Sequence, residues 1–172
     1  MNTKTKNWLG ESGDESNLVA LDISDLPYQI LYCSKPVSTI RCHRKIADDL
    51  KHRLLNIWAA ARAEVKKIHG YDESTAYYDN RTRIYLHSLH LDIYAGCYNN
   101  RSQRGSTATS SHAWGAALDW NPADNALGTK GNMPKWWINV WTQRIGDIRW
   151  VWGGGWLKLR CDPMHVEVEY LG

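Results

Sequence analysis

The clearest periodic pattern along the chain is helical and runs from Arg41 to His69. Its apolar positions recur mostly every three or four residues, at Ile46, Leu50, Leu54, Trp58, Val65 and Ile68. Gly70 follows at the position where a glycine commonly ends a helix. We therefore expect one long amphipathic helix over 41–69, with its apolar face against a sheet.

Weaker patterns predict the elements around this helix. Two short stretches, 28–33 and 37–42, read as strands or extended pieces. Residues 71–83 predict a loop, and the alternation over 84–100, which shifts phase near Ser88, predicts a strand with an irregularity. Pro134 opens a second amphipathic helix, whose apolar stripe consists of Trp137, Val140, Trp141 and Ile145.

Two further strands carry different residues on their two faces. Between Gly115 and Asn121, alternation puts Asp119 on one face and Leu118 and Trp120 on the other. Over 165–170, a face with His165, Glu167 and Glu169 alternates with an apolar face. We expect the apolar face of each strand to pack in the core and the polar face to line a functional site.

The order of these elements indicates the fold class and the domain organisation. Strands and helices do not alternate in a βαβ rhythm, so we expect an α+β fold with a small antiparallel sheet backed by helices. A chain of 172 residues suits one domain. The polar residues 1–26 predict an N-terminal arm or extension, and 27–172 form the predicted domain.

Composition and charge narrow the classes of partner. The chain has ten Trp, nine Tyr and no Phe, and we expect most of these rings in the core. A net charge of +3 with no long basic run makes a nucleic-acid-binding role improbable. No segment has membrane-spanning length and the N-terminus lacks an apolar signal region, which predicts synthesis in a cytoplasm and no stable membrane insertion.

The four cysteines at 33, 42, 97 and 161 are too sparse for a disulfide framework. We expect reduced thiols, although Cys33 and Cys42 could pair across adjacent strands in an oxidising compartment.

Candidate chemistry lies on the two-faced strands. His112, Asp119 and His165 offer two imidazoles and one carboxylate toward a common face. This set suits a zinc ion, which takes nitrogen and oxygen ligands and keeps a fourth position open in catalytic sites. Asp162, three residues before His165, could reach a metal-bound water and serve as a general base and then as a proton donor.

Two neighbouring polar residues have supporting roles. We interpret Ser110 as a hydrogen-bonding brace for the histidine loop, because no His/Asp relay is left to activate it as a nucleophile once a metal holds those residues. Glu167 either orients His165 as a hydrogen-bond acceptor or is an exposed strand carboxylate.

Two motifs resemble one peptidase family. "SSHAWGAALD" at 110–119 matches the pattern SxHxxGxAxD, and "DPMH" at 162–165 matches [DE]xxH. Together with "GCYNNR", "DWNP" and "WGGGWLKLR", they resemble the zinc D-alanyl-D-alanine carboxypeptidase and L-alanyl-D-glutamate endopeptidase family, peptidase family M15. The similarity extends from about residue 40 to the C-terminus.

The resemblance implies a role for each matching residue. His112, Asp119 and His165 would be the Zn²⁺ ligands and Asp162 the catalytic acid/base. Arg101 would bind a substrate carboxylate or the developing oxyanion, although Arg104 stands close by. The implied fold is the small zinc peptidase fold shared by the Hedgehog zinc-binding domain and the DD-peptidases.

The resemblance also implies a substrate and a setting. An Asp in the [DE]xxH position resembles the phage endolysin branch, so we expect a cell-wall hydrolase that cuts the L-alanyl-D-glutamate bond of peptidoglycan. We expect a monomer that is released to the periplasm or wall with the help of a holin-like permeabilising partner. The alternatives are a D-alanyl-D-alanine carboxypeptidase and a non-catalytic, zinc-stabilised binding or structural module.

Overall fold

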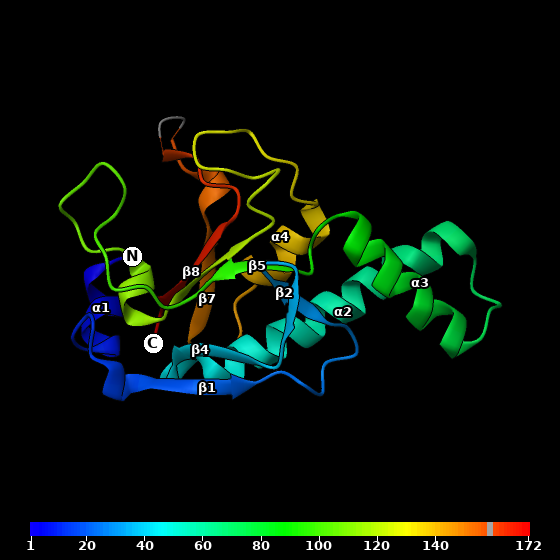
Figure 1. The fold of residues 1–172 in the computed structure, drawn as a ribbon, viewed down its shortest axis with the longest axis horizontal. Coiled ribbons are helices and arrows are strands. Elements are labelled where there is room, and N and C mark those ends of the chain that lie inside the picture. Colours follow the sequence, from blue (N-terminus) through cyan, green and yellow to red (C-terminus); the bar gives the residue numbers. More distant parts are fainter. Residues whose placement is uncertain (158–159) are drawn as a thin grey trace.

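The computed structural model describes residues 1–157 and 160–172 and shows two sheets packed with helices (Figure 1). The α-helices in this part of the chain are α1 (Thr3–Leu9), α2 (Ala47–His69), α3 (Thr75–Ser88) and α4 (Lys135–Thr142). A two-stranded antiparallel sheet consists of β1 (Leu18–Asp22) and β4 (Thr39–His43). A six-stranded sheet has, in spatial order, β3 (Lys35–Val37), β2 (Ile30–Tyr32), β5 (Ile93–Gly96), β6 (Ala117–Trp120), β8 (His165–Tyr170) and β7 (Ile148–Trp152). The α+β class is confirmed.

The larger sheet is mixed, so the expectation of a purely antiparallel sheet is corrected. β2 and β5 run parallel, and the other neighbouring pairs run antiparallel. A parallel neighbour needs a long crossover connection. Here β3, β4, α2 and α3 all lie between β2 and β5 in the chain.

The long helix is confirmed with a later start. Residues 39–43 pair with β1 as β4, and a 3₁₀ turn over Arg44–Ile46 separates that strand from α2. Its buried apolar stripe includes Leu50, Leu54 and Ile57, and it ends before Gly70, whose φ is +85°. A glycine at this φ avoids the steric penalty that a side chain would bring.

The interpretation of residues 71–100 is wrong in its first half. Residues 75–88 form α3, which packs on α2, and the strand is limited to β5. The Ser74 hydroxyl caps the helix by accepting from Tyr77 N at 3.2 Å. The buried positions Tyr78, Thr82 and Leu86 are spaced by four, and the β-forming tyrosines and threonine in this stretch obscured that period.

Tryptophans form the centre of the core. Trp120 of β6, Trp141 of α4 and Trp150 of β7 are at most 1 % exposed, and the ring centroids of Trp141 and Trp150 are 5.0 Å apart. α4 lies between α2 and β7. It follows Pro134 as expected but ends at Thr142, so Ile145 lies beyond it.

A buried arginine joins α2 to the end of α4. Arg53 is fully buried and pairs with Asp49 at 2.8 Å. It also donates to the carbonyls of Val140 and Trp141 at 2.7 and 2.8 Å. These carbonyls belong to the last turn of α4, where the helix has no partner for them, so a cation there is favourable.

Residues 1–26 contribute regular structure that packs on the rest of the chain. α1 lies against β8, where Tyr170 N donates to Thr5 Oγ1 at 3.0 Å and the rings of Trp8 and Tyr170 stack 4.5 Å apart. Figure 1 shows the N-terminus beside the C-terminal strand. The boundary between an arm and a domain at residue 26 stays a prediction.

The four cysteines are free thiols; Cys33 is exposed, whereas Cys42 and Cys97 are buried. Within residues 1–157 and 160–172, no helix combines the length and the apolar character needed to cross a bilayer.

Candidate metal centre

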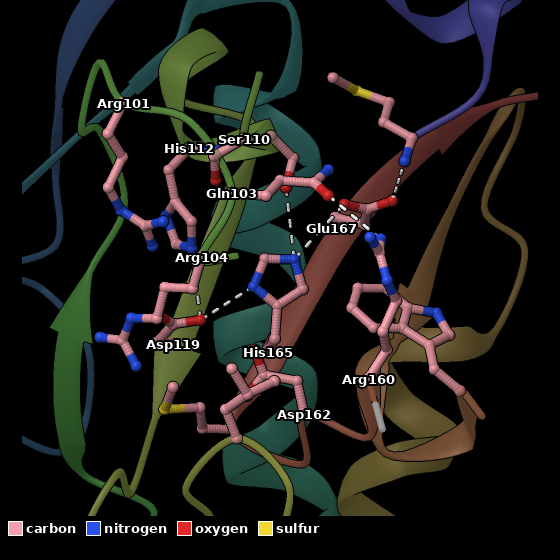
Figure 2. Close-up of a pocket in the computed structure, with 15 residues that line it drawn as sticks. Arg101, Gln103, Arg104, Ser110, His112, Asp119, Arg160, Asp162, His165 and Glu167 are labelled. Atoms are coloured by element: carbon pink, nitrogen blue, oxygen red, sulfur yellow. Dashed lines mark hydrogen bonds and ion pairs between the residues drawn. The ribbon is translucent and has the colours of Figure 1, made fainter. Parts of the chain in front are cut away.

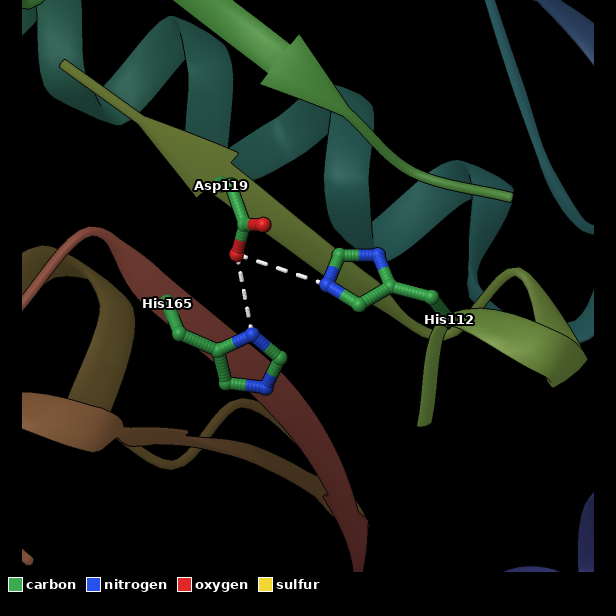
Figure 3. A group of neighbouring side chains, drawn as sticks. All are labelled: His112, Asp119 and His165. Atoms are coloured by element: carbon green, nitrogen blue, oxygen red, sulfur yellow. Dashed lines mark hydrogen bonds and ion pairs between the residues drawn. The ribbon is translucent and has the colours of Figure 1, made fainter. Parts of the chain in front are cut away.

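Three elements bring the predicted ligands together. His112 lies in the 3₁₀ turn Ser111–Trp114, Asp119 lies on β6, and His165 begins β8. Asp119 and His165 are direct cross-strand partners, which turns their side chains to the same face. Figure 3 shows one oxygen of Asp119 facing both imidazoles, with Oδ1 3.3 Å from His112 Nε2 and 2.9 Å from His165 Nδ1.

The turn that carries His112 depends on its two end residues. Ser110 Oγ accepts from His112 N at 3.4 Å, which is the bracing position expected for this serine. Gly115 ends the turn with φ +64°. A Cβ at Gly115 would lie 2.7 Å from Leu18 Cδ2 and 3.0 Å from His43 N, so both the backbone conformation and the close packing require glycine.

The hydrogen bonds of His112 leave one nitrogen free. Its Nδ1 lies 2.6 Å from the Cys97 carbonyl, to which it donates, so Nε2 carries the lone pair. Nε2 is buried and makes no hydrogen bond to any described residue, because its contact with Asp119 Oδ1 at 3.3 Å is an ion-pair distance only. An unpartnered buried acceptor is costly unless a ligand uses it.

The other imidazole has partners at both nitrogens. His165 Nδ1 faces Asp119, and its Nε2 lies 3.3 Å from Ser111 Oγ and 3.4 Å from Glu167 Oε2. Glu167 therefore sits where an acceptor would fix the ring of a metal-ligating histidine. Glu167 is 5 % exposed, which excludes the alternative that it is an exposed carboxylate on the strand.

The side-chain atoms of the three residues fit a single metal ion. One nitrogen or oxygen from each lies within 4.8 Å of the others. Tetrahedral ligation at about 2.1 Å would place ligand atoms about 3.4 Å apart, close to the 2.9 and 3.3 Å measured here. Two imidazoles and a carboxylate can therefore hold a divalent cation at this point.

The electrostatics of the site favour a cation. Burial opposes ionisation of Asp119, yet the two histidines lower the pKa of its carboxyl below the usual range. Burial likewise opposes ionisation of Glu167, but His165 and the α-amino group of Met1 lower its pKa to about 2. Burial disfavours the charged form of His165, but Asp119 and Glu167 raise its pKa to about 9. The site thus keeps two ionised carboxylates in a buried position.

A cavity of about 300 Å³ opens beside these residues and is lined by all three (Figure 2). Asp162 also lines it, and its Oδ1 is buried without a hydrogen-bond partner in the described part of the chain. Burial raises the pKa of this carboxyl above its ordinary value. Gly153 passes close behind, because a Cβ there would lie 2.5 Å from the Asp162 carbonyl, so the glycine-rich turn holds Asp162 against the cavity.

The remaining predicted residue, Arg101, lines the same cavity, as does Arg104. Arg101 Nη1 donates to the Ser102 carbonyl at 3.1 Å. The structure therefore brings every predicted site residue to one cavity or its immediate wall.

Sequence reasoning missed seven residues that line the cavity: Met1, Gln103, Ser111, Leu127, Trp156, Arg160 and Met164. Ser111 contacts His165, and the Trp156 ring lies 5.4 Å from the His165 ring, centroid to centroid. Arg160 and Met1 line the cavity, and the Met1 α-amino nitrogen lies 2.5 Å from Glu167 Oε1. Ser111, Trp156, Arg160 and Met164 stand inside the quoted motifs and could have been found there; the other three carry no sequence signal.

His87 and His90 lie outside the site, as expected. His87 pairs with Asp92 at 2.8 Å and His90 with Asp124 at 3.1 Å. Among residues 1–157 and 160–172, the cluster of three or more metal-binding side chains is that of His112, Asp119 and His165.

Comparison with known proteins agrees with this geometry. A family model described as D-alanyl-D-alanine carboxypeptidase matches residues 104–168. Neither the curated proteins nor the solved structures contain a significant match to the chain. The matched segment includes His112, Asp119, Asp162 and His165, so this part of the chain is similar to the M15 family of peptidases.

Proposed function

We propose that the protein is a zinc-dependent peptidase that hydrolyses a stem-peptide amide bond of bacterial peptidoglycan, the L-alanyl-D-glutamate bond in particular. One observation carries the proposal: the unpartnered Nε2 of His112 and the unpartnered Oδ1 of Asp162 line one cavity with Asp119 and His165. A metal ligand and a proton acceptor are the two groups that such a hydrolysis needs, and both are left free in the fold.

Zn²⁺ is the proposed metal because two imidazoles and one carboxylate are a ligand set typical of catalytic zinc. When bound, zinc polarises a carbonyl and lowers the pKa of water to about 7. Glu167 and Ser111 would hold the His165 ring in place, and Ser110 would hold the turn that carries His112. These contacts fix the ligands before a metal arrives.

Asp162 is the proposed acid/base. Its Oδ1 would accept a proton from the attacking water as the carbon–oxygen bond forms. The same oxygen would then return the proton to the leaving amine as the carbon–nitrogen bond breaks. Arg101, on the wall of the cavity, would bind a substrate carboxylate or stabilise the negative charge that develops on the scissile carbonyl oxygen.

The biological setting belongs to the same proposal. An Asp at position 162 and the stretch 152–156 support the endolysin-like branch, acting as a monomer on peptidoglycan in the periplasm or wall after a holin-like partner opens the membrane. We also propose the zinc peptidase fold shared by Hedgehog domains and DD-peptidases, with the catalytic domain over 27–172.

The description of the matched family favours one second candidate, a D-alanyl-D-alanine carboxypeptidase. A non-catalytic zinc module is disfavoured, because a structural site would need no free carboxylate at position 162 and would be closed by a fourth protein ligand.

The test compares wild type with Asp162→Asn on purified peptidoglycan. We expect Asp162→Asn to keep its zinc content, measured by mass spectrometry of the metal, and to lose turnover by about a hundredfold or more. Asp72→Asn, an exposed carboxylate in a loop, is the matched control and should keep full activity.

Fragment analysis identifies the bond. New N-terminal D-glutamate supports the endopeptidase, whereas released D-alanine supports the carboxypeptidase. Equal activity of wild type and Asp162→Asn would contradict the enzymatic role of this carboxylate.

A further inference from the structure

The walls of the cavity carry arginines that form no ion pair with a carboxylate of the described residues. Arg101, Arg104 and Arg160 all line the cavity. Figure 2 draws Arg101 and Arg104 on one side of His165 and Arg160 on the other. Within the described part of the chain, no carboxylate lies within 4.0 Å of these three guanidinium groups, whereas five other arginines form ion pairs: Arg41, Arg53, Arg62, Arg144 and Arg149.

The contacts that these cavity arginines make are neutral and easily exchanged. Arg101 donates to a backbone carbonyl, and Arg160 Nη1 donates to Gln103 Oε1 at 3.3 Å. A hydrogen bond to a neutral amide at an exposed position contributes little. A carboxylate offers a guanidinium two parallel, charge-assisted hydrogen bonds and would replace such a contact.

Arg104 and Arg160 are both exposed and come from different segments, 101–110 and 153–162. Two cations that approach one cavity from opposite walls can bind one carboxylate of a ligand that lies between them. The cavity of about 300 Å³ is at the small end of ligand pockets, so it suits a short peptide segment.

We propose that Arg104 and Arg160 form a clamp that binds a substrate carboxylate beside the scissile bond. This role is distinct from the one proposed for Arg101. The clamp makes the enzyme prefer stem peptides in which this carboxylate is free over stem peptides in which it is amidated. The inference rests on the proposed peptidase function and deepens it. A primary amide at the same place has one acceptor oxygen instead of two and carries no charge. Its NH2 group donates, so it cannot accept a hydrogen bond from a guanidinium group.

The test uses two synthetic pentapeptides, L-Ala-γ-D-Glu-L-Lys-D-Ala-D-Ala and the same peptide with the D-Glu α-carboxylate as an amide. Both contain either candidate bond, and the products show which one is cut. Release of D-alanine at equal kcat/KM from both peptides would overturn a clamp on the D-Glu α-carboxylate. The measured quantity is the ratio of kcat/KM for the free acid to kcat/KM for the amide, from chromatography of the products.

For wild type we expect a ratio of about ten or more, since a hydrogen bond to a charged group contributes about 1.5–3 kcal/mol. Arg104→Gln and Arg160→Gln should each lower kcat/KM for the free acid about tenfold, chiefly through KM, and leave the amide nearly unchanged. The ratio for wild type should also fall at high salt, because exposed charges are screened. Arg81→Gln, an exposed arginine outside the cavity, is the matched control and should keep the wild-type ratio.

Zinc content and circular dichroism of each variant show that fold and metal site are retained. Hydrolysis of both peptides by wild type at equal kcat/KM, or a ratio that neither substitution changes, would overturn the clamp while leaving the peptidase function intact. Hydrolysis of neither peptide nor of whole peptidoglycan would instead contradict the proposed function itself.

Discussion

At the scale of single residues, the site is built from side chains that are held at one atom and free at another. His112 donates from Nδ1 to the Cys97 carbonyl and keeps Nε2 free. Asp162 is held through its backbone, since its N donates to the Gly153 carbonyl at 3.0 Å, and its Oδ1 is free. A group oriented in this way needs little further ordering when a ligand binds, which is the physical meaning of preorganisation.

Outside the site, His43 gives a prediction about pH. It is 1 % exposed; its Nε2 donates to the Leu9 carbonyl at 3.0 Å, and its Nδ1 accepts from Lys45 N at 3.1 Å. Burial lowers its pKa from the ordinary 6.5, and the charges of Lys45 and Arg44 act in the same direction, against the Leu9 contact and Asp14. The unfolded chain therefore takes up this proton first as pH falls.

We expect the free energy of unfolding to drop as pH decreases below about 6.5, with His43 contributing up to about 1.4 kcal/mol per pH unit. His43→Gln should reduce this slope in urea unfolding measured between pH 8 and 5. His52→Gln, on the exposed side of α2, should retain it. An unchanged slope in His43→Gln would show that this ring is not the group responsible.

At the scale of elements, the metal centre depends on two strands and one turn. β6 and β8 pair in a register that sets Asp119 opposite His165 and Ala117 opposite Glu167. The 3₁₀ turn before β6 delivers His112 to the same place and ends at Gly115. The turn contacts β4 as well, where His43 N donates to the Gly115 carbonyl at 2.9 Å.

Gly115→Ala is expected to lower stability by about 2–4 kcal/mol, because it adds both backbone strain at φ +64° and a clash with Leu18 and the His43 backbone. Zinc affinity should fall with it, since the turn carries His112. The matched control is Gly105→Ala, at φ +69° but with nothing within 4 Å of the added Cβ. It should cost only about 1–2 kcal/mol. Equal losses in denaturant unfolding of the two variants would show that packing at Gly115 does not matter.

At the scale of the whole molecule, the proposed ligands join parts of the chain that are far apart in sequence. A metal bound by them would link the turn at 111–114 with β6 and β8, and it would bind the folded chain but not the unfolded one. It should therefore stabilise the molecule by mass action.

Zinc at a free concentration of 100 times its Kd should contribute about 2.7 kcal/mol and raise Tm by about 5–10 °C. Differential scanning calorimetry with zinc, and then with excess EDTA, measures this shift. His112→Ala should abolish the shift, whereas His52→Ala, an exposed histidine on α2, should keep it. A zinc-dependent shift that persists in His112→Ala would place the metal elsewhere.

The site was more predictable from sequence than the fold around it. His112, Asp119, Asp162 and His165 stand in two short motifs whose chemistry is local, and strand alternation alone puts Asp119 and His165 on polar faces. The parallel pairing of β2 with β5 depends on contacts between distant segments, and α3 was hidden by its β-forming residues. The position of Met1 at the cavity follows from tertiary packing, which no local pattern encodes.

The cross-strand pairing of Asp119 with His165 fixes the number of residues within the two paired strands. Inserting or deleting one residue within β8 would turn Val166 toward the cavity and send a histidine or a glutamate into the tryptophan core, because alternate residues of a strand face opposite sides. The loop at 70–74 between α2 and α3 bears no such restriction, since its residues are exposed and none of them lines the cavity. Insertions and deletions that leave the metal centre intact therefore belong in loops of this kind, and the two strands can change only by substitution.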